Sequence, residues 1–193
     1  MELTPLGIEG AWLAESHVWS DDRGHFREWF KHEEIYAKTG FSFSALQANI
    51  SESKRGVIRG IHYSLAPEGQ AKWITCISGA ILDVIVDIRP ESPTYKKVEL
   101  IRVDAGSKKS LLIGRGLGHG FVSLSETSIV SYLLSSAYNP QLEHAIDFFD
   151  EELKINLDSF LIDRKPLLSE RDRLAPGLIE LEKLNLLPPF NRS

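Results

Sequence analysis

Residues 72–88, Lys-Trp-Ile-Thr-Cys-Ile-Ser-Gly-Ala-Ile-Leu-Asp-Val-Ile-Val-Asp-Ile, decide the fold of this chain. They contain two runs of mostly β-branched and other apolar residues, at 72–77 and 80–88, separated by Ser78-Gly79. Short apolar runs bounded by turn residues are typical of β-strands. The stretch therefore predicts two consecutive strands joined by a tight turn.

Similar strand-like runs continue in both directions along the chain. They cover residues 11–18, 44–50, 56–63, 97–103, 110–113, 120–124 and 129–135. Polar, glycine- or proline-containing turns at 21–24, 89–93 and 104–106 separate them. Regularly spaced short strands with such punctuation favour an all-β sandwich or barrel over a parallel βαβ fold.

Two segments have a helical character instead. Residues 32–38, stopped by Thr39-Gly40, predict a brief helix that ends at a glycine. From Ser169 onward, Leu178, Leu181 and Leu184 are spaced along one helical face, and Pro188-Pro189 ends the pattern. With no repeat or linker in between, we expect this C-terminal helix to pack on the β domain as part of one unit.

Length, composition and charge exclude several classes of protein. At 193 residues, with 42% hydrophobic and 25% charged residues, the chain fits one globular domain. The net charge of −5 and the pI near 5.7 argue against general binding of nucleic acid or anionic membrane. One cysteine, Cys76, excludes an internal disulfide framework, and its alternating apolar run predicts a small core residue. Without a signal peptide or spanning segment, a cytoplasmic location is expected.

Three cationic or titratable side chains lie close together in the predicted strands. Arg59 suits phosphate binding, His62 can take a proton near neutral pH, and Lys72 can stabilise a carbonyl oxygen that becomes negative. A lone histidine in an apolar run is more often structural, but three such groups in one pocket would require an anion. Strand alternation places Arg59 and His62 on opposite faces. The functional interpretation therefore requires a bulge or strong twist at Gly60.

Two aspartates share one face of the run at 80–88, opposite Leu82, Val84 and Val86. One interpretation of Asp83 and Asp87 is a solvated outer face. The other places Asp83 in the pocket as a partner for Lys72 or Arg59, and the pattern does not choose between them.

Three further positions have both a structural and a chemical interpretation. The glycine-rich residues 114–121 predict a tight turn that feeds a strand, with His119 at the mouth of the strand and no nucleotide-binding fingerprint. Tyr132 is by default a core tyrosine. Ser169-Glu170-Arg171-Asp172 can start a helix as a capping box, or Asp172 can hold the second nitrogen of a histidine.

Taken in order, six motifs resemble the dTDP-4-dehydrorhamnose 3,5-epimerase family over nearly the whole chain. They are Arg59–Tyr63, Gln70–Lys72, Asp83–Arg89, Ser92–Thr94, His119–Phe121 and Leu168–Asp172. The resemblance implies an all-β, cupin-type jelly-roll with short peripheral helices, as a single domain over 1–193 whose core covers about 44–138 and whose helical segment covers about 169–187. It also implies a homodimer that needs no cofactor or metal. The implied reaction inverts C3 and C5 of a dTDP-4-dehydro-6-deoxy-D-glucose-type sugar nucleotide.

The resemblance also implies roles for individual residues. His62 matches the general base of the family, Tyr132 its general acid, and Asp172 the residue that orients the base, while Lys72 would stabilise the enolate. Positions that match contacts to nucleotide, phosphate or sugar are Arg23, Glu28, Gln47, Asn49, Arg59, Lys72, Asp83, His119, Tyr138, Glu143 and Arg171. Two features depart from the family pattern. Arg171 stands where many members have lysine, and residues 133–137 are less polar than usual.

Two other classes of function fit the residues less well. A metal-dependent cupin needs a His-x-His pair, whereas this chain has His62-Tyr63-Ser64, so only His62 and His119 remain as ligands. A non-catalytic dTDP-sugar binding module needs no opposed acid and base, which argues against it. Inversion at C3 alone and ketoisomerisation of the same substrate class remain open alternatives.

Overall fold

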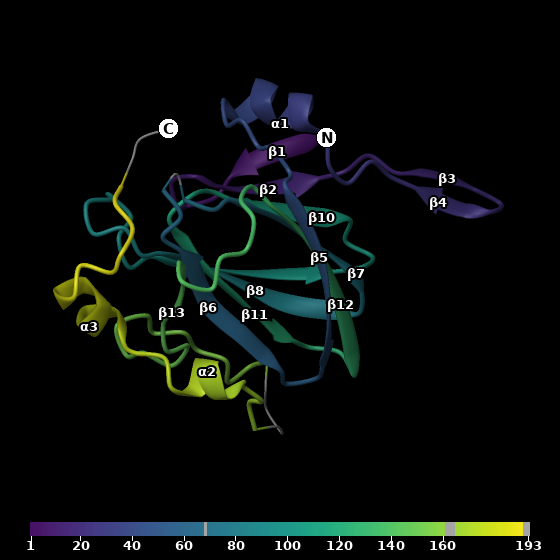
Figure 1. Ribbon diagram of the computed structural model, residues 1–193. Helices are drawn as coiled ribbons and strands as arrows, with labels where there is room; N and C mark the ends of the chain where they lie inside the picture. Colours follow the sequence, from purple (N-terminus) through teal and green to yellow (C-terminus); the bar gives the residue numbers. More distant parts are fainter. Residues whose placement is uncertain (68, 161–164, 191–193) are drawn as a thin grey trace.

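Two antiparallel β-sheets face each other in the computed structural model, which describes residues 1–67, 69–160 and 165–190 (Figure 1). The six-stranded sheet has the order β1 (Glu2–Pro5), β2 (Ala11–Glu15), β10 (Lys109–Ile113), β7 (Lys72–Ser78), β12 (Thr127–Leu134) and β5 (Gln47–Lys54). The five-stranded sheet has the order β13 (Glu143–Ala145), β6 (Ile58–Ser64), β11 (Leu117–Ser123), β8 (Ala80–Asp87) and β9 (Val98–Asp104). The predicted double-sheet β architecture is confirmed.

The space between the sheets holds one apolar core. Ile74 and Val130 of the six-stranded sheet pack there with Ile81, Ile85 and Phe121 of the five-stranded sheet. These residues alternate along their strands, so the side chains between them on each strand point away from the core. The residues that face the inside of the sandwich can therefore be assigned from this cluster.

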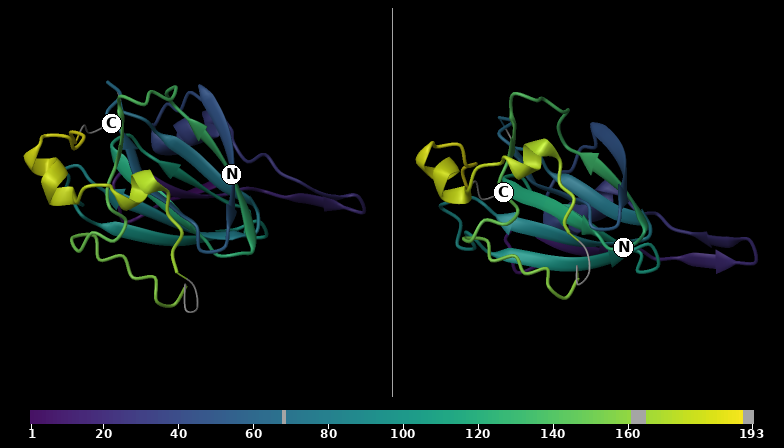
Figure 2. Two further views of the ribbon diagram at one scale, coloured as in Figure 1. Left: turned by 60° about the horizontal axis from the view of Figure 1, so that its bottom comes forward. Right: turned by 90° about the horizontal axis from the view of Figure 1, so that it is seen from below.

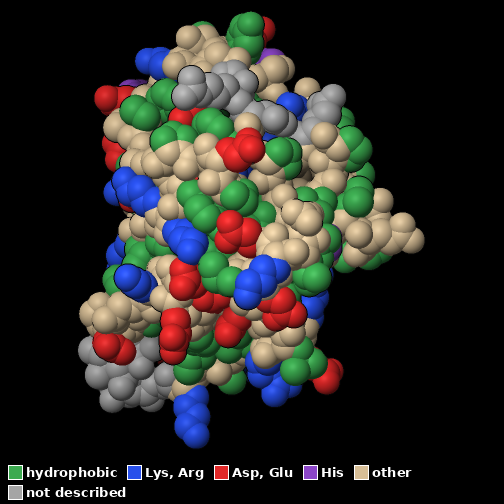
Figure 3. Space-filling model, turned by 90° about the vertical axis from the view of Figure 1, so that its left-hand side faces the viewer, with side chains coloured by type: hydrophobic (Ala, Val, Ile, Leu, Met, Phe, Trp, Pro, Cys, Tyr) green, Lys and Arg blue, Asp and Glu red, His purple; other side chains and the backbone are tan. Residues whose placement is uncertain are grey.

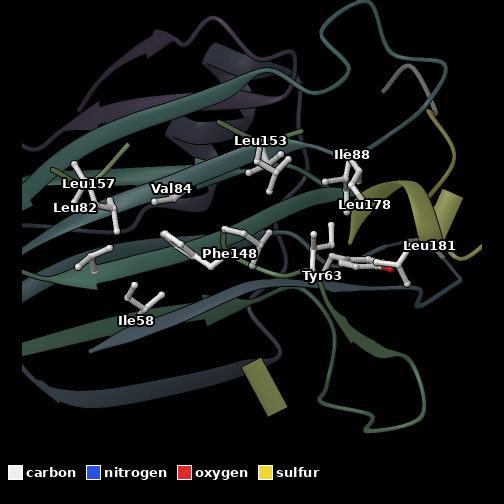
Figure 4. Packing of buried hydrophobic residues seen from close by; sticks show 14 residues of the cluster. Ile58, Tyr63, Leu82, Val84, Ile88, Phe148, Leu153, Leu157, Leu178 and Leu181 are labelled. Atoms are coloured by element: carbon white, nitrogen blue, oxygen red, sulfur yellow. The ribbon is translucent and has the colours of Figure 1, made fainter. Parts of the chain in front are cut away.

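A second core covers the outer face of the five-stranded sheet (Figure 4). Leu82 and Val84 of β8 lie in this cluster near Phe148, and Leu178 and Leu181 lie at its other end. Phe148 and these two leucines come from the chain that follows β13. All eight residues of β8 are consequently buried. Of the two interpretations of Asp83 and Asp87, the solvated outer face is wrong, because both aspartates are buried and share the inner face with Ile81 and Ile85.

The N-terminal part covers the outer face of the six-stranded sheet. Helix α1 (His32–Thr39) ends at Gly40, whose φ of 72° is left-handed, as its sequence predicts. Ile35, Phe43 and Trp73 form the buried contact beneath it. Before α1, β3 (Trp19–Asp21) and β4 (Gly24–Phe26) form a hairpin that extends away from both sheets (Figures 1 and 2).

The C-terminal segment does not form the single helix that its leucine spacing predicts. Helix α2 (Glu170–Arg173) and helix α3 (Leu178–Lys183) are separated by a break that contains Pro176 and Gly177. Leu178 and Leu181 are buried, but Leu184 lies beyond α3 and is 58% exposed. The face of the molecule that carries α3 mixes acidic, basic and apolar side chains (Figure 3).

Within the described ranges, no helix is long and apolar enough to cross a membrane. Cys76 is free and buried, as its position in an apolar run predicts. Each predicted run corresponds to an observed strand, although β5 lies further along the chain than residues 44–50 and β11 already begins at Leu117. His119 is therefore inside a strand rather than at its mouth. Strands β1, β3, β4 and β13 lie outside the predicted runs.

Candidate active site

A register shift in β6 brings Arg59 and His62 to the same side of the sheet. Arg59 pairs with Phe121 of β11 and His62 with His119, so three steps along β6 match two steps along β11. Gly60 lies at this irregularity with a φ of 114°, and a Cβ there would meet the Gly120 Cα at 2.5 Å. Since Phe121 belongs to the core between the sheets, both Arg59 and His62 face that interior. The predicted break in strand alternation at Gly60 is confirmed.

His62 forms a short hydrogen bond with a buried carboxylate. Its Nε2 lies 2.6 Å from Oδ1 of Asp172, which is 3% exposed. Burial raises the pKa of Asp172, but hydrogen bonds from His62, Ser169 and the Gly60 backbone outweigh burial and lower it. Asp172 therefore stays ionised and holds the ring, which leaves Nδ1 as the nitrogen that can take a proton.

The same aspartate also belongs to the first turn of α2. Its backbone N–H donates to the Oγ of Ser169, the N-cap residue, at 3.1 Å. Helix α2 lies beside β6 in Figure 1, so the cap sets the position of the carboxylate beside His62. Both interpretations of Asp172, as a residue of the helix cap and as the partner of a histidine, are therefore correct.

Lys72 lies at the start of β7 with its amino group buried near His62. It is 7% exposed, and its Nζ donates to the backbone oxygen of His62 at 3.3 Å. Burial lowers its pKa from 10.5 to about 8, against the opposing effect of the Glu143 and Asp83 charges. An ammonium group with a lowered pKa and few protein partners is suited to stabilise a negative oxygen.

Asp83 and His119 form a second buried pair next to Lys72. The His119 Nε2 lies 2.9 Å from Oδ2 of Asp83. Burial is the largest influence on His119 and lowers its pKa, against the raising effect of Asp83, so the imidazole is neutral. The hydrogen-bond partner of Asp83 is thus His119 and not Arg59, while the Asp83 charge acts on Lys72.

Two arginines line a cavity of about 390 Å³ beside the His62–Asp172 pair. Arg59 Nε donates to the Oγ of Ser53 at 3.0 Å, which holds the guanidinium in place. Arg171 Nη2 donates to the backbone oxygen of Glu143 at 2.9 Å. The cavity is lined by Val57, Ile58, Arg59, His62, Leu167, Leu168, Ser169, Arg171 and Asp172. Two fixed positive charges beside an imidazole suit a phosphorylated ligand.

The opposite sheet presents the remaining candidates. Tyr132 pairs with Asn49 across β12 and β5 and packs against the core between the sheets, so it faces the sheet that carries His62. Gln47 donates from Nε2 to Oδ1 of Asn49 and accepts from the backbone N–H of Tyr138, at 3.0 and 2.8 Å. A phenol on one sheet and an imidazole on the other give the interior two groups that can act from different sides.

The structure does not bring Arg23 and Glu28 to this cluster. Arg23 lies on the β3–β4 hairpin, where its side chain is 90% exposed and pairs with Asp21. Glu28 follows the hairpin and pairs with Lys31. Every residue of the two hairpin strands is exposed, so no packing folds them back onto their own chain.

Ser53 is a site residue that the sequence does not single out. It shares a face of β5 with Gln47 and Asn49, so strand alternation from these two positions is the signal that could have found it. Across the described parts of the chain, no group of three or more His, Cys, Asp or Glu side chains is arranged to hold a metal ion.

Comparison with known proteins identifies closely similar chains. The family model described as dTDP-4-dehydrorhamnose 3,5-epimerase matches residues 5–180. The chain is 42% identical to a protein of that name from Streptomyces griseus, covering 97% of this chain and 92% of the relative. It is 44% identical to a dTDP-4-dehydro-6-deoxyglucose 3-epimerase from a Streptomyces species, covering 96% and 93%. Among solved structures, an epimerase from Mycobacterium tuberculosis superposes with a TM-score of 0.94 at 38% identity, covering 98% of this chain and 94% of the other.

Proposed function

The chain belongs to the dTDP-4-dehydrorhamnose 3,5-epimerase family and has its cupin-type jelly-roll fold, and we propose that it inverts C3 and C5 of a dTDP-linked 4-keto-6-deoxy sugar. As a sugar-nucleotide epimerase it is an isomerase. The observation that carries the finer proposal is the position of His62, which Asp172 orients at the edge of a cavity that Arg59 also lines. A base and a phosphate anchor thus flank one ligand site.

The proposed chemistry follows from the C4 ketone of the substrate. The ketone acidifies the protons on C3 and C5, so one base can remove either of them to form an enolate. His62 removes the proton while Asp172 stabilises the imidazolium that forms. Lys72 stabilises the negative oxygen of the enolate, and Tyr132 gives its phenol proton to the carbon on the opposite face. Proton exchange with water then returns His62 to its neutral form and Tyr132 to its phenol. Arg59 holds the diphosphate and fixes the sugar for both steps.

We also propose that the enzyme is a homodimer whose hairpins complete the partner site. The phosphate-binding candidate Arg23 lies in the turn between β3 and β4, and this hairpin extends away from both sheets (Figure 1). Trp19 and Phe26 on the same hairpin are 49% and 64% exposed, which gives the hairpin an apolar surface for a second copy. Sedimentation of a Trp19→Ser, Phe26→Ser variant tests the dimer: we expect a shift to monomer, and an unchanged dimer would reject this contact.

The buried, free Cys76 is compatible with a reducing cytoplasm, where we expect the enzyme to act.

Incubation with the 4-keto sugar nucleotide in deuterated water tests the reaction directly. We expect deuterium at both C3 and C5 by NMR, and none at either carbon with His62→Ala. Tyr132→Phe keeps the ring but removes the proton donor, so exchange should continue while inversion at C5 fails.

Inversion at C3 alone is the second candidate, because close relatives of this chain include a 3-epimerase. Deuterium at C3 only would establish it. Tight binding of the nucleotide sugar without exchange at either carbon would instead indicate a binding module.

A further inference from the structure

Arg171 makes a contact that a simple phosphate anchor does not need. Its Nη2 donates to the backbone oxygen of Glu143, while the next residue, Asp172, holds His62. One turn of helix α2 is therefore bonded both to β6 and to β13, the neighbouring strand.

Strand β13 is three residues long and lies at the edge of its sheet. Its hydrogen bonds to β6 use alternate residues: Leu65 N–H donates to Leu142 O, and Ile61 N–H donates to Ile146 O. In an antiparallel pair the carbonyl of Glu143, between these positions, points to the free edge. Arg171 therefore donates to a backbone oxygen on the free edge of β13, the side that faces away from β6.

The Glu143 side chain projects from the inner face of the sheet, toward the site. Glu143 pairs with Ser64 in β6, two residues beyond His62 on the same inner face. Its Oε1 is buried with no hydrogen-bond partner among the residues that the structure describes, and its charge acts on the buried Lys72. A shift of β13 would therefore move a carboxylate that faces Lys72.

We propose that Arg171 is a positioning residue that fixes the edge strand β13 and so keeps the Glu143 carboxylate beside Lys72. The proposal rests on the epimerase function proposed above, but its contact can be tested without activity. Lys72 is faced by Asp83 of β8, Glu143 of β13, and the histidines His62 and His119 of β6 and β11. Of these four groups, Glu143 lies on the shortest strand.

The variant Arg171→Met should lower kcat about five- to tenfold, the change that one typical hydrogen bond supports. Arg171 also lines the cavity, so removing its charge can weaken dTDP binding, which calorimetry measures; kcat at saturating substrate reports the positioning role separately from that loss of affinity. The alkaline limb of the kcat profile should move to lower pH, since Glu143 no longer raises the pKa of Lys72. Arg171→Lys, which retains a donor, should recover most of kcat. Arg173→Met, which removes another exposed arginine of the same helix, is the matched control.

Amide hydrogen exchange tests the positioning role of Arg171 independently of the proposed epimerase activity. The Leu65 and Ile146 amides, which bond across the β6–β13 pair, should exchange faster in Arg171→Met than in Arg173→Met. If the unaltered enzyme proves inactive, this comparison still decides whether Arg171 holds the strand. A dTDP affinity that falls tenfold or more with kcat unchanged would identify Arg171 as a phosphate contact and overturn the proposal. Equal behaviour of the two variants in every measurement would overturn it too.

Discussion

Replacing Asp172 with asparagine removes one negative charge from the His62 pair and leaves its shape almost unchanged. The carboxylate is 3% exposed and its oxygen lies 2.6 Å from the His62 Nε2. A hydrogen bond to a charged group contributes about 1.5–3 kcal/mol, and about 1.4 kcal/mol corresponds to a tenfold change in rate. We therefore expect kcat for deuterium exchange to fall roughly 10- to 150-fold. The asparagine amide can also donate to Nε2, which would place the ring proton on Nδ1 and block the base.

The assay measures deuterium incorporation at C3 and C5 under saturating substrate, with dTDP affinity as the binding control. Thermal unfolding shows whether the variant is folded, because the backbone of residue 172 still caps α2 through Ser169. Affinity for dTDP should be unchanged. A kcat within about threefold of the unaltered enzyme would refute an orienting role for Asp172, since even a weak charged hydrogen bond contributes more than that.

Three other predictions concern the lysine, the bulge and metal ions. Activity should decline as pH rises through about 8, because Lys72 then loses the proton that stabilises the enolate, and Lys72→Met should abolish this limb of the kcat profile. Gly60→Ala should destabilise the protein by about 2–6 kcal/mol in denaturant unfolding, from backbone strain plus a clash with Gly120, whereas Gly40→Ala, which has a left-handed φ but open space, should cost only about 1–3 kcal/mol. Chelators should leave exchange unchanged; loss of activity that one divalent ion restores would revive the metal-cupin hypothesis.

The strands can be predicted wherever apolar residues alternate between glycine or proline turns, as in β7 and β8. Strands β1 and β13 escape prediction because they are short and contain polar residues, so pairing with neighbours rather than their own pattern makes them strands. The leucine spacing of the C-terminal segment predicts one helix, but Pro176 breaks it. Local sequence thus predicts a strand well only when the strand contributes its own apolar face.

The site is harder to predict because alternation shows which side chains share a face of a strand, but not which face points to the interior of the sandwich. Alternation places Asp83 and Asp87 on one face, but β8 is buried on both sides and has no polar side that marks the exterior. Residue chemistry does select His62, Lys72 and Arg59 as one group. The contact between His62 and Asp172 joins positions 110 residues apart, which strand and helix patterns cannot connect.

The shifted register of β6 has a consequence for the spacing of the ligand groups. In a regular strand, side chains separated by an odd number of positions have opposite parity and cannot share a ligand. The extra residue at Gly60 shifts the alternation of side chains by one position. Arg59 and His62 therefore face the same side of the sheet although an odd number of positions separates them. Because three steps along β6 match two steps along β11, the phosphate anchor and the base lie about as far apart along the sheet as in an Arg-x-His arrangement, with one more residue between them. An odd separation between two functional side chains that flank a glycine is therefore a signature of a bulge that can be read from the amino-acid sequence alone.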